Sequence, residues 1–275
     1  KDHGMTPEHV SLAQLGMGDE GPVAMIEAAA AAGFGAVGLP LRSGALRPLP
    51  TEIIGNPPVI RAIQTACRAT GITVFDVEAL VLGHEPGPDD LRRTFETAAQ
   101  IGASRMSCLG YEPARGPGDL PPQGAAERLA AIAAVAREFG LLICVEFMAF
   151  RAINSLGAAA AIIAASGAEN ARIVLDALHF HRTGATLAEV AVLPPGLVSH
   201  LQLCDAAATA PPPDALAAEA RGQRLLPGAG VIPLRGLIAA LPEAAPLSLE
   251  IPTAALAALP VACRARIGAV ALAAL

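Results

Sequence analysis

The chain has 275 residues, 53% of them hydrophobic, and a formal net charge of −6 from 19 Lys and Arg against 25 Asp and Glu. This length and apolar content suffice for one large core, and no linker divides the sequence, so we expect a single domain over residues 1–275. The acidic balance excludes a broad phosphate-binding surface, because nucleic-acid affinity depends mainly on clustered Lys and Arg.

Short β-like runs alternate with Ala-rich helical stretches along the whole chain. The predicted strands are residues 10–15, 36–41, 72–80, 105–110, 141–147, 172–180, 198–205 and 246–251. The predicted helices are residues 22–33, 56–70, 89–101, 123–139, 156–166, 186–193, 233–241 and 253–274. This strict alternation predicts a closed (β/α)8 TIM barrel with active-site residues at the carboxyl ends of the strands. An open doubly wound sheet is the alternative, but no GxGxxG motif follows the first strand.

A long connection follows the seventh predicted strand. Residues 206–230 contain three consecutive prolines at 211–213 and end in the sequence LLPGAG at 225–230. A connection this long inside a compact barrel is usually either functional or disordered. We therefore predict that residues 206–230 form a lid over the active site.

Several features indicate a cytoplasmic protein. The five cysteines are widely spaced and form no CxxC pair, as expected for reduced thiols. The uncharged run at residues 152–168 directly follows a predicted strand and contains polar residues, which favours a buried helix over a membrane span. Residues 1–4 have no apolar signal-peptide segment.

Four predicted strands in the second half of the chain each carry a side-chain oxygen donor near their carboxyl ends. These donors are Glu146, Asp176, Gln202 and Glu250. Alternation of side chains along a strand allows all four to face the barrel interior at one rim. A single such acid is often a helix N-cap or a surface group, but four buried donors require a compensating charge, which favours a divalent metal ion. An all-oxygen set favours Mg²⁺ or Mn²⁺ over tetrahedral zinc.

The order and spacing of four short motifs are also informative. They are VLDALH at 174–179, HLQLCD at 200–205, RLLPGAG at 224–230 and LSLE at 247–250. Together they resemble the xylose isomerase-like TIM-barrel superfamily, which includes sugar phosphate isomerases and epimerases and is related to 3-dehydroshikimate dehydratases and endonuclease IV. The resemblance implies one divalent metal ion held by the four donors named above. Many members have His where this chain has Gln202.

The resemblance also implies roles for individual residues. His179 of the DxxH sequence would reach a substrate oxygen, the alternative being a loop histidine bonded to backbone. Glu146 and Glu250, on strands separated by two others, are expected to act as catalytic base and acid as well as ligands. The metal ion would stabilise the negative charge that develops when a proton is removed beside a carbonyl.

Three further residues are expected to bind substrate. Arg224 precedes the LLPGAG sequence, where the resemblance implies an Arg that approaches the substrate or closes the lid. Arg42 follows the second strand, and Glu78 ends the third. For Arg42, and likewise for Arg151, an ordinary solvated rim charge is the alternative to binding a carboxylate or phosphate. For Glu78 the alternative is a buried carboxylate paired with an arginine. Arg182 is expected to be a solvated loop residue, the alternative being anion binding.

The predicted function is a divalent-metal-dependent isomerase or epimerase of a sugar or hydroxy-ketone. A lyase of the 3-dehydroshikimate dehydratase type is the main alternative, because the same carbanion can expel a β-hydroxyl group. An endonuclease IV-type enzyme is disfavoured, since its zinc cluster needs more histidines and its substrate a basic groove. A non-catalytic sugar-binding protein is the fourth alternative. The expected partner is a small polyhydroxy ketone or sugar-like molecule. We expect no binding to nucleic acid or to a membrane, and the protein could form a homo-oligomer.

Overall fold

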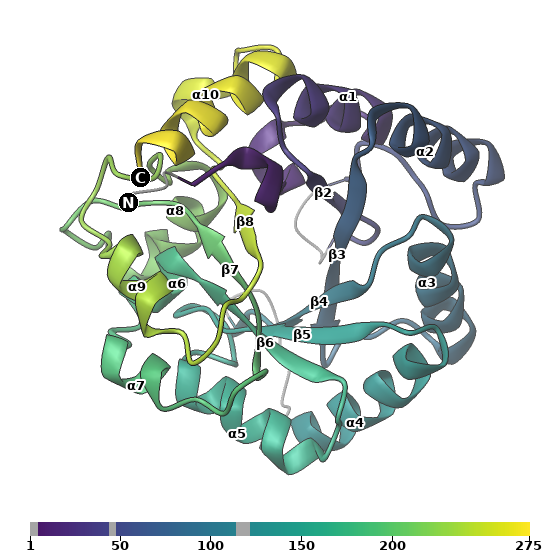
Figure 1. The fold of residues 1–275 in the computed structure, drawn as a ribbon. Coiled ribbons are helices and arrows are strands. Elements are labelled where there is room, and N and C mark those ends of the chain that lie inside the picture. Colours follow the sequence, from purple (N-terminus) through teal and green to yellow (C-terminus); the bar gives the residue numbers. More distant parts are fainter. Residues whose placement is uncertain (1–4, 44–47, 114–121) are drawn as a thin grey trace.

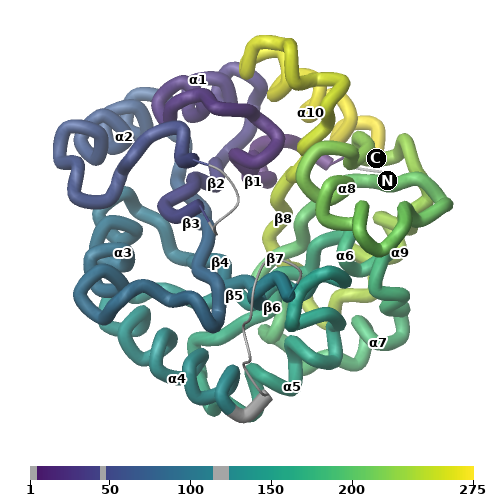
Figure 2. The backbone as a smooth tube through the Cα atoms, turned by 180° about the vertical axis from the view of Figure 1, so that it is seen from behind, coloured from purple at the N-terminus to yellow at the C-terminus, as the bar shows by residue number. Residues whose placement is uncertain are grey.

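The computed structural model describes residues 5–43, 48–113 and 122–275. In these residues eight parallel strands pair in sequence order, and β1 pairs with β8 to close the barrel. Figures 1 and 2 show the helices as a ring around the strands, with α10 beside α1 where the ring closes. The predicted (β/α)8 fold is confirmed.

The bounds of the elements are as follows. The strands are β1 Val10–Leu12, β2 Ala36–Pro40, β3 Thr73–Leu82, β4 Arg105–Gly110, β5 Leu142–Glu146, β6 Ala171–Asp176, β7 Val198–Leu203 and β8 Leu247–Leu249. The α-helices are α1 Pro22–Ala32, α2 Pro57–Thr70, α3 Pro88–Gln100, α4 Pro122–Glu138, α5 Leu156–Ser166, α6 Ala177–Arg182, α7 Leu187–Ala191, α8 Leu216–Gly222, α9 Leu234–Ala240 and α10 Val261–Ala274. Short 3-10 helices are η1 Pro7–His9, η2 Gln14–Met17, η4 Pro213–Ala215 and η5 Ala254–Leu256.

Several predicted elements differ from the structure. The first strand, predicted over residues 10–15, ends at Leu12 and is followed by η2, and the eighth, predicted over 246–251, covers only Leu247–Leu249. The sixth strand was expected to continue to residue 180, but it ends at Asp176, whose carboxylate accepts a hydrogen bond from the backbone N–H of His179 and so caps α6. The helix predicted over 253–274 is divided into η5 and α10, because Pro260 cannot continue a helix and serves as the N-cap of α10.

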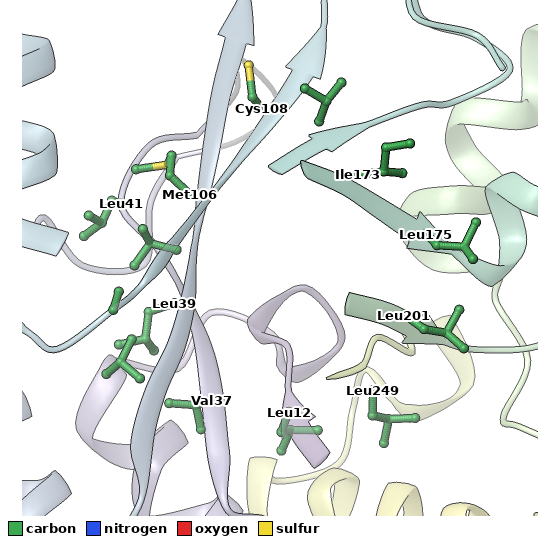
Figure 3. Close-up of a cluster of buried hydrophobic side chains, with 14 of the residues drawn as sticks. Leu12, Val37, Leu39, Leu41, Met106, Cys108, Ile173, Leu175, Leu201 and Leu249 are labelled. Atoms are coloured by element: carbon green, nitrogen blue, oxygen red, sulfur yellow. The ribbon is translucent and has the colours of Figure 1, made fainter. Parts of the chain in front are cut away.

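The main hydrophobic core lies between the strands and the surrounding helices. Figure 3 shows part of it, including Leu12, Leu175, Leu201 and Leu249 from four strands of the barrel. Many of the residues that alternate with these along the strands are polar and buried, as in the case of Ser248 beside Leu249. One face of the strands therefore packs against the helices, while the other carries polar groups inside the barrel.

Residues 206–230, predicted as a lid, include secondary structure of their own. The segment holds η4 and α8, and Leu225 pairs with Asp205 through two backbone hydrogen bonds of 2.8 Å. The carboxylate of Asp205 accepts hydrogen bonds from the backbone N–H groups of Ala206, Gly228 and Ile232. These bonds fix both ends of the segment to the barrel rim. Its role as a lid stays a prediction.

Two properties relate to the composition. All five cysteines, each in the described part of the chain, are free thiols. Among the helices described, none has the length and apolar character that crossing a bilayer requires.

Candidate metal centre and pocket

The four predicted ligands lie at the same end of the barrel, as their positions in the sequence indicated. Glu146 and Asp176 are the last residues of β5 and β6, Gln202 pairs with Asp176 across the β6–β7 ladder, and Glu250 follows β8. All four side chains are buried, and none is more than 6% exposed. The structure thus brings three carboxylates and one amide to the rim of one barrel.

Arg224 supplies a positive charge to this group. Its Nη1 lies 2.5 Å from Asp176 Oδ2, and its Nη2 lies 2.8 Å from Glu250 Oε2. Burial opposes ionisation of Asp176, but the charge of Arg224, the neighbouring His179 and the hydrogen bonds from both residues together hold the pKa of that carboxyl below its usual range. Arg224, which was predicted to bind substrate, therefore also contacts two predicted metal ligands.

Glu146 and His179 form the second part of the group. Nε2 of His179 lies 3.6 Å from Glu146 Oε1, and both side chains are buried. Burial, followed by the charges of Asp176 and Glu250, raises the pKa of Glu146 well above its usual value. Burial lowers the pKa of His179 to about 4, so its imidazole is neutral at pH 7. The alternative interpretation of His179 as a loop histidine was wrong, because residue 179 is part of α6.

The donor atoms fit a divalent cation. Ligand atoms of Glu146, Asp176 and His179 all lie within 4.8 Å of one another. The Oε1 atom of Gln202 is buried and has no hydrogen-bond partner among the described residues. An oxygen of this kind beside an ionised carboxylate is a suitable ligand for a hard metal ion. Glu146, Asp176 and His179 can therefore approach one ion, whereas Glu250, which is ion-paired with Arg224, is not part of this group among the described residues.

A pocket opens above these residues. Its lining includes Glu146, Glu250, His179 and Arg224 together with the predicted substrate-binding residues Arg42 and Glu78. One wall is apolar and is formed by Ala79, Leu109, Met148 and Phe150. The sequence-predicted catalytic, metal-binding and substrate-binding residues, apart from Asp176 and Gln202, thus line a single pocket, and those two lie directly beside it.

The arginines of the rim are held by specific contacts. Arg42 donates from Nε to Thr94 Oγ1 over 2.8 Å and from Nη2 to the backbone carbonyl of Asp90 over 3.2 Å. Arg151, for which a solvated rim charge was one alternative, is buried and donates to the carbonyl of Gly110.

The prediction that Arg182 is solvated was wrong. Its side chain is only 4% exposed and bonds to both carboxylate oxygens of Glu219, at 2.6 and 2.9 Å. This pair connects α6 with α8. Because the two partners come from separate segments, neither motif spacing nor local pattern indicated the contact.

Asp76 is an interior residue that sequence reasoning missed. Its side chain is buried, and neither carboxylate oxygen has a hydrogen-bond partner among the described residues. Burial, and then the charge of Glu250, raises the pKa of Asp76 to about 7. Gly38 on the adjacent strand leaves room for it, since a Cβ there would lie 2.6 Å from Asp76 Oδ1. Its position two residues before Glu78, on the same strand face, was the available signal.

Comparison with known protein families supports the barrel fold. A family model described as xylose isomerase-like TIM barrel matches residues 26–268. No curated protein matches the sequence.

Solved structures with the same fold include three that are informative here. The IolI protein, solved with a binding zinc atom, is 14% identical with a TM-score of 0.80, covering 97% of this chain and 96% of its own. The 3-keto-D-glucoside 4-epimerase YcjR from E. coli is 16% identical with a TM-score of 0.71, and the match covers 97% of this chain and 99% of YcjR. The probable 3-DHS dehydratase AsbF from Bacillus anthracis is 12% identical with a TM-score of 0.72, and the match covers 96% of this chain and 98% of AsbF.

Proposed function

Since this chain belongs to the xylose isomerase-like TIM-barrel family, we propose that it is a divalent-metal-dependent isomerase or epimerase of a small hydroxy-ketone or sugar-like substrate. The observation that carries the proposal is the meeting of Glu146 and Glu250 in one pocket beside Asp176 and Gln202. The zinc atom of IolI and the epimerase activity in the name of YcjR support it by similarity of fold.

The metal ion would be held by Glu146, Asp176, Gln202 and Glu250, with Mg²⁺ or Mn²⁺ favoured by their oxygen donors. Bound there, it would supply a Lewis acid that favours loss of a proton from the carbon next to a carbonyl. The remaining chemistry belongs to the side chains of the pocket.

Glu146 and Glu250 are the proposed base and acid. They belong to β5 and to the end of β8, with β6 and β7 between them, so they approach the pocket from different sides. One carboxylate removes the proton from carbon, and the other group returns a proton to the neighbouring position or to the opposite face.

The other pocket residues bind and orient the substrate. His179 is a neutral imidazole, and it can donate a hydrogen bond to a substrate oxygen or accept one from a hydroxyl group. Arg42 and Glu78 lie toward β2 and β3, where they would hold the more distant oxygens of the substrate. Arg224 contacts the same carboxylates as the metal ion would.

A carbon–oxygen lyase is the second candidate. Gln202 stands where many relatives have His, and Gln as the third ligand resembles bacterial 3-dehydroshikimate dehydratases; the fold of the probable dehydratase AsbF is similar. The first step is the same proton removal, after which a β-hydroxyl leaves. An unsaturated product would indicate the lyase, whereas an epimer or an aldose–ketose pair would indicate the isomerase.

Metal binding is the first test of the proposal. Protein stripped with a chelator, dialysed against Mn²⁺ and washed should retain about one ion per chain by elemental analysis, and anomalous scattering should locate it beside Asp176. Asp176→Asn should retain less Mn²⁺, whereas the exposed Asp214→Asn should equal the wild type. Absence of an ion at this rim at millimolar Mn²⁺ would refute the proposed centre.

A further inference from the structure

The side chain of Arg224 joins two of the proposed metal ligands. Its guanidinium contacts Asp176 Oδ2 at 2.5 Å and Glu250 Oε2 at 2.8 Å. The other carboxylate oxygen of Asp176 accepts the backbone N–H of His179 at 2.9 Å. Each oxygen of Asp176 therefore already has a donor, and its negative charge is already balanced by a cation of the protein itself.

The position of this guanidinium is fixed by further contacts. Nε of Arg224 donates to the carbonyl of Ala220 at 2.9 Å. Its backbone N–H donates to the carbonyl of Pro252 at 3.2 Å, and its own carbonyl accepts the hydroxyl of Thr253 at 2.7 Å. The side chain is 2% exposed. Because the backbone is attached to the chain after β8, the charge is held at the carboxylates before any ligand binds.

From these contacts we infer that Arg224 is an internal competitor of the metal ion: its guanidinium and a divalent cation are alternative partners of Asp176 and Glu250. The inference rests on the proposed function, since it takes these two carboxylates as metal ligands. An arginine does not lose its proton in a protein, so Arg224 cannot become neutral when an ion arrives. Two cations at one buried pair of carboxylates repel each other strongly.

When an ion binds Asp176 and Glu250, the guanidinium moves away from them, while the backbone stays attached to Pro252 and Thr253. Arg224 lines the pocket, so the displaced guanidinium faces the space that a substrate would occupy. In the metal-free protein the same side chain keeps two buried carboxylates paired. Arg224 thus lowers the affinity of the site for a metal ion.

Mn²⁺ titration of three proteins tests the inference, with binding followed by calorimetry and by the EPR signal of free Mn²⁺. The proteins are the wild type, Arg224→Met and the matched control Arg221→Met. Arg221 lies in the same segment and lines the same pocket, but it pairs with Glu112 rather than with a proposed ligand. Arg224→Met should bind Mn²⁺ about ten-fold more tightly than the wild type or better, since it removes the competing charge. Arg221→Met should bind as the wild type does.

The outcomes separate this inference from the proposed function. Mn²⁺ binding to the wild type with equal or weaker binding to Arg224→Met would overturn the inference and leave the metal centre intact. If only Arg224→Met bound Mn²⁺, the result would support the competition between Arg224 and the metal ion. It would contradict the proposal that the wild type depends on a metal ion. No binding to any of the three proteins would overturn both.

A second variant covers the case in which Arg224→Met folds only with metal present. Arg224→Lys keeps a positive charge that can reach one carboxylate at a time, so its Mn²⁺ affinity should lie between those of the wild type and Arg224→Met. Thermal unfolding supplies an independent readout: Mn²⁺ should raise the Tm of Arg224→Lys more than that of the wild type. An equal or smaller rise would contradict the inference.

Discussion

Gln202 lies directly opposite Asp176 in the ladder between β6 and β7, and its buried Oε1 has no hydrogen-bond partner among the described residues. The pair places a neutral carbonyl oxygen beside an ionised carboxylate. An imidazole at residue 202 would instead offer nitrogen, which zinc prefers more than magnesium does. The identity of this one side chain should therefore control which metal the centre selects.

Replacing Gln202 with His should raise the ratio of Zn²⁺ to Mg²⁺ affinity by about ten-fold or more. Competition titrations of the two metals against wild type and Gln202→His measure this ratio. Gln223→His, an exposed change of the same type, should leave it as in the wild type. An unchanged ratio in Gln202→His would mean that residue 202 is not a ligand.

Gly230 should be required for the turn that follows α8. A Cβ at this residue would overlap the carbonyl oxygen of Ala206 and the carboxylate of Asp205. Gly230→Ala should reduce the free energy of unfolding by about 2 kcal/mol, as expected when an atom is forced into a packed site. Gly222→Ala is the control, since no neighbouring atom lies within 4 Å of its added Cβ. Urea unfolding that shows equal stability for both variants would contradict the described turn.

Asp76 should make the stability of the metal-free protein depend on pH. Its pKa is about 7 in the folded chain because of burial, against 3.8 for an ordinary Asp, so the folded state holds a proton that the unfolded state releases. The stabilisation from this proton is fully present below pH 3.8 and is lost as the pH rises through 7. Between pH 5 and pH 8 the wild type should lose about 2 kcal/mol more than Asp76→Asn, whose amide does not titrate.

Urea unfolding with a chelator at these two pH values measures the difference. The exposed Asp214→Asn should follow the wild type, because its side chain is solvated in both states. Parallel pH dependence of wild type and Asp76→Asn would show that Asp76 does not hold this proton.

The sequence predicted the barrel and the location of its polar rim well, for reasons that particular residues illustrate. Strands such as β5 are short apolar runs that end in an acid, and the alternation of side chains assigned Glu146 to the interior without any tertiary information. The same alternation should have indicated Asp76, which precedes Glu78 by two residues. Each of these assignments depends only on the local order of residues along one strand.

Contacts between distant segments could not be predicted in this way. Arg182 and Glu219 meet only because α6 and α8 pack together, and Arg224 reaches Asp176 across 48 positions of the chain. At the end of β6 a longer strand and a helix were both compatible with the sequence. Residues 177–180 are largely apolar, as in a strand, but Asp176 caps a helix there. Local pattern does not show which of these structures is the more stable.

Exchange of a carbon-bound hydrogen with D₂O shows whether Glu146 and Glu250 transfer a proton next to a carbonyl. Mn²⁺-loaded wild type should be incubated in D₂O with a panel of keto-sugars, cyclitol ketones and dehydroshikimate, and exchange followed by NMR. At least one compound should exchange the hydrogen next to its carbonyl, and Glu250→Gln should slow this by about 10²-fold or more, because the amide keeps an oxygen but cannot accept the proton. Glu243→Gln, an exposed change of the same type, should have the wild-type rate. Undiminished exchange by Glu250→Gln after removal of metal with a chelator would show that neither Glu250 nor a metal ion takes part in the proton transfer.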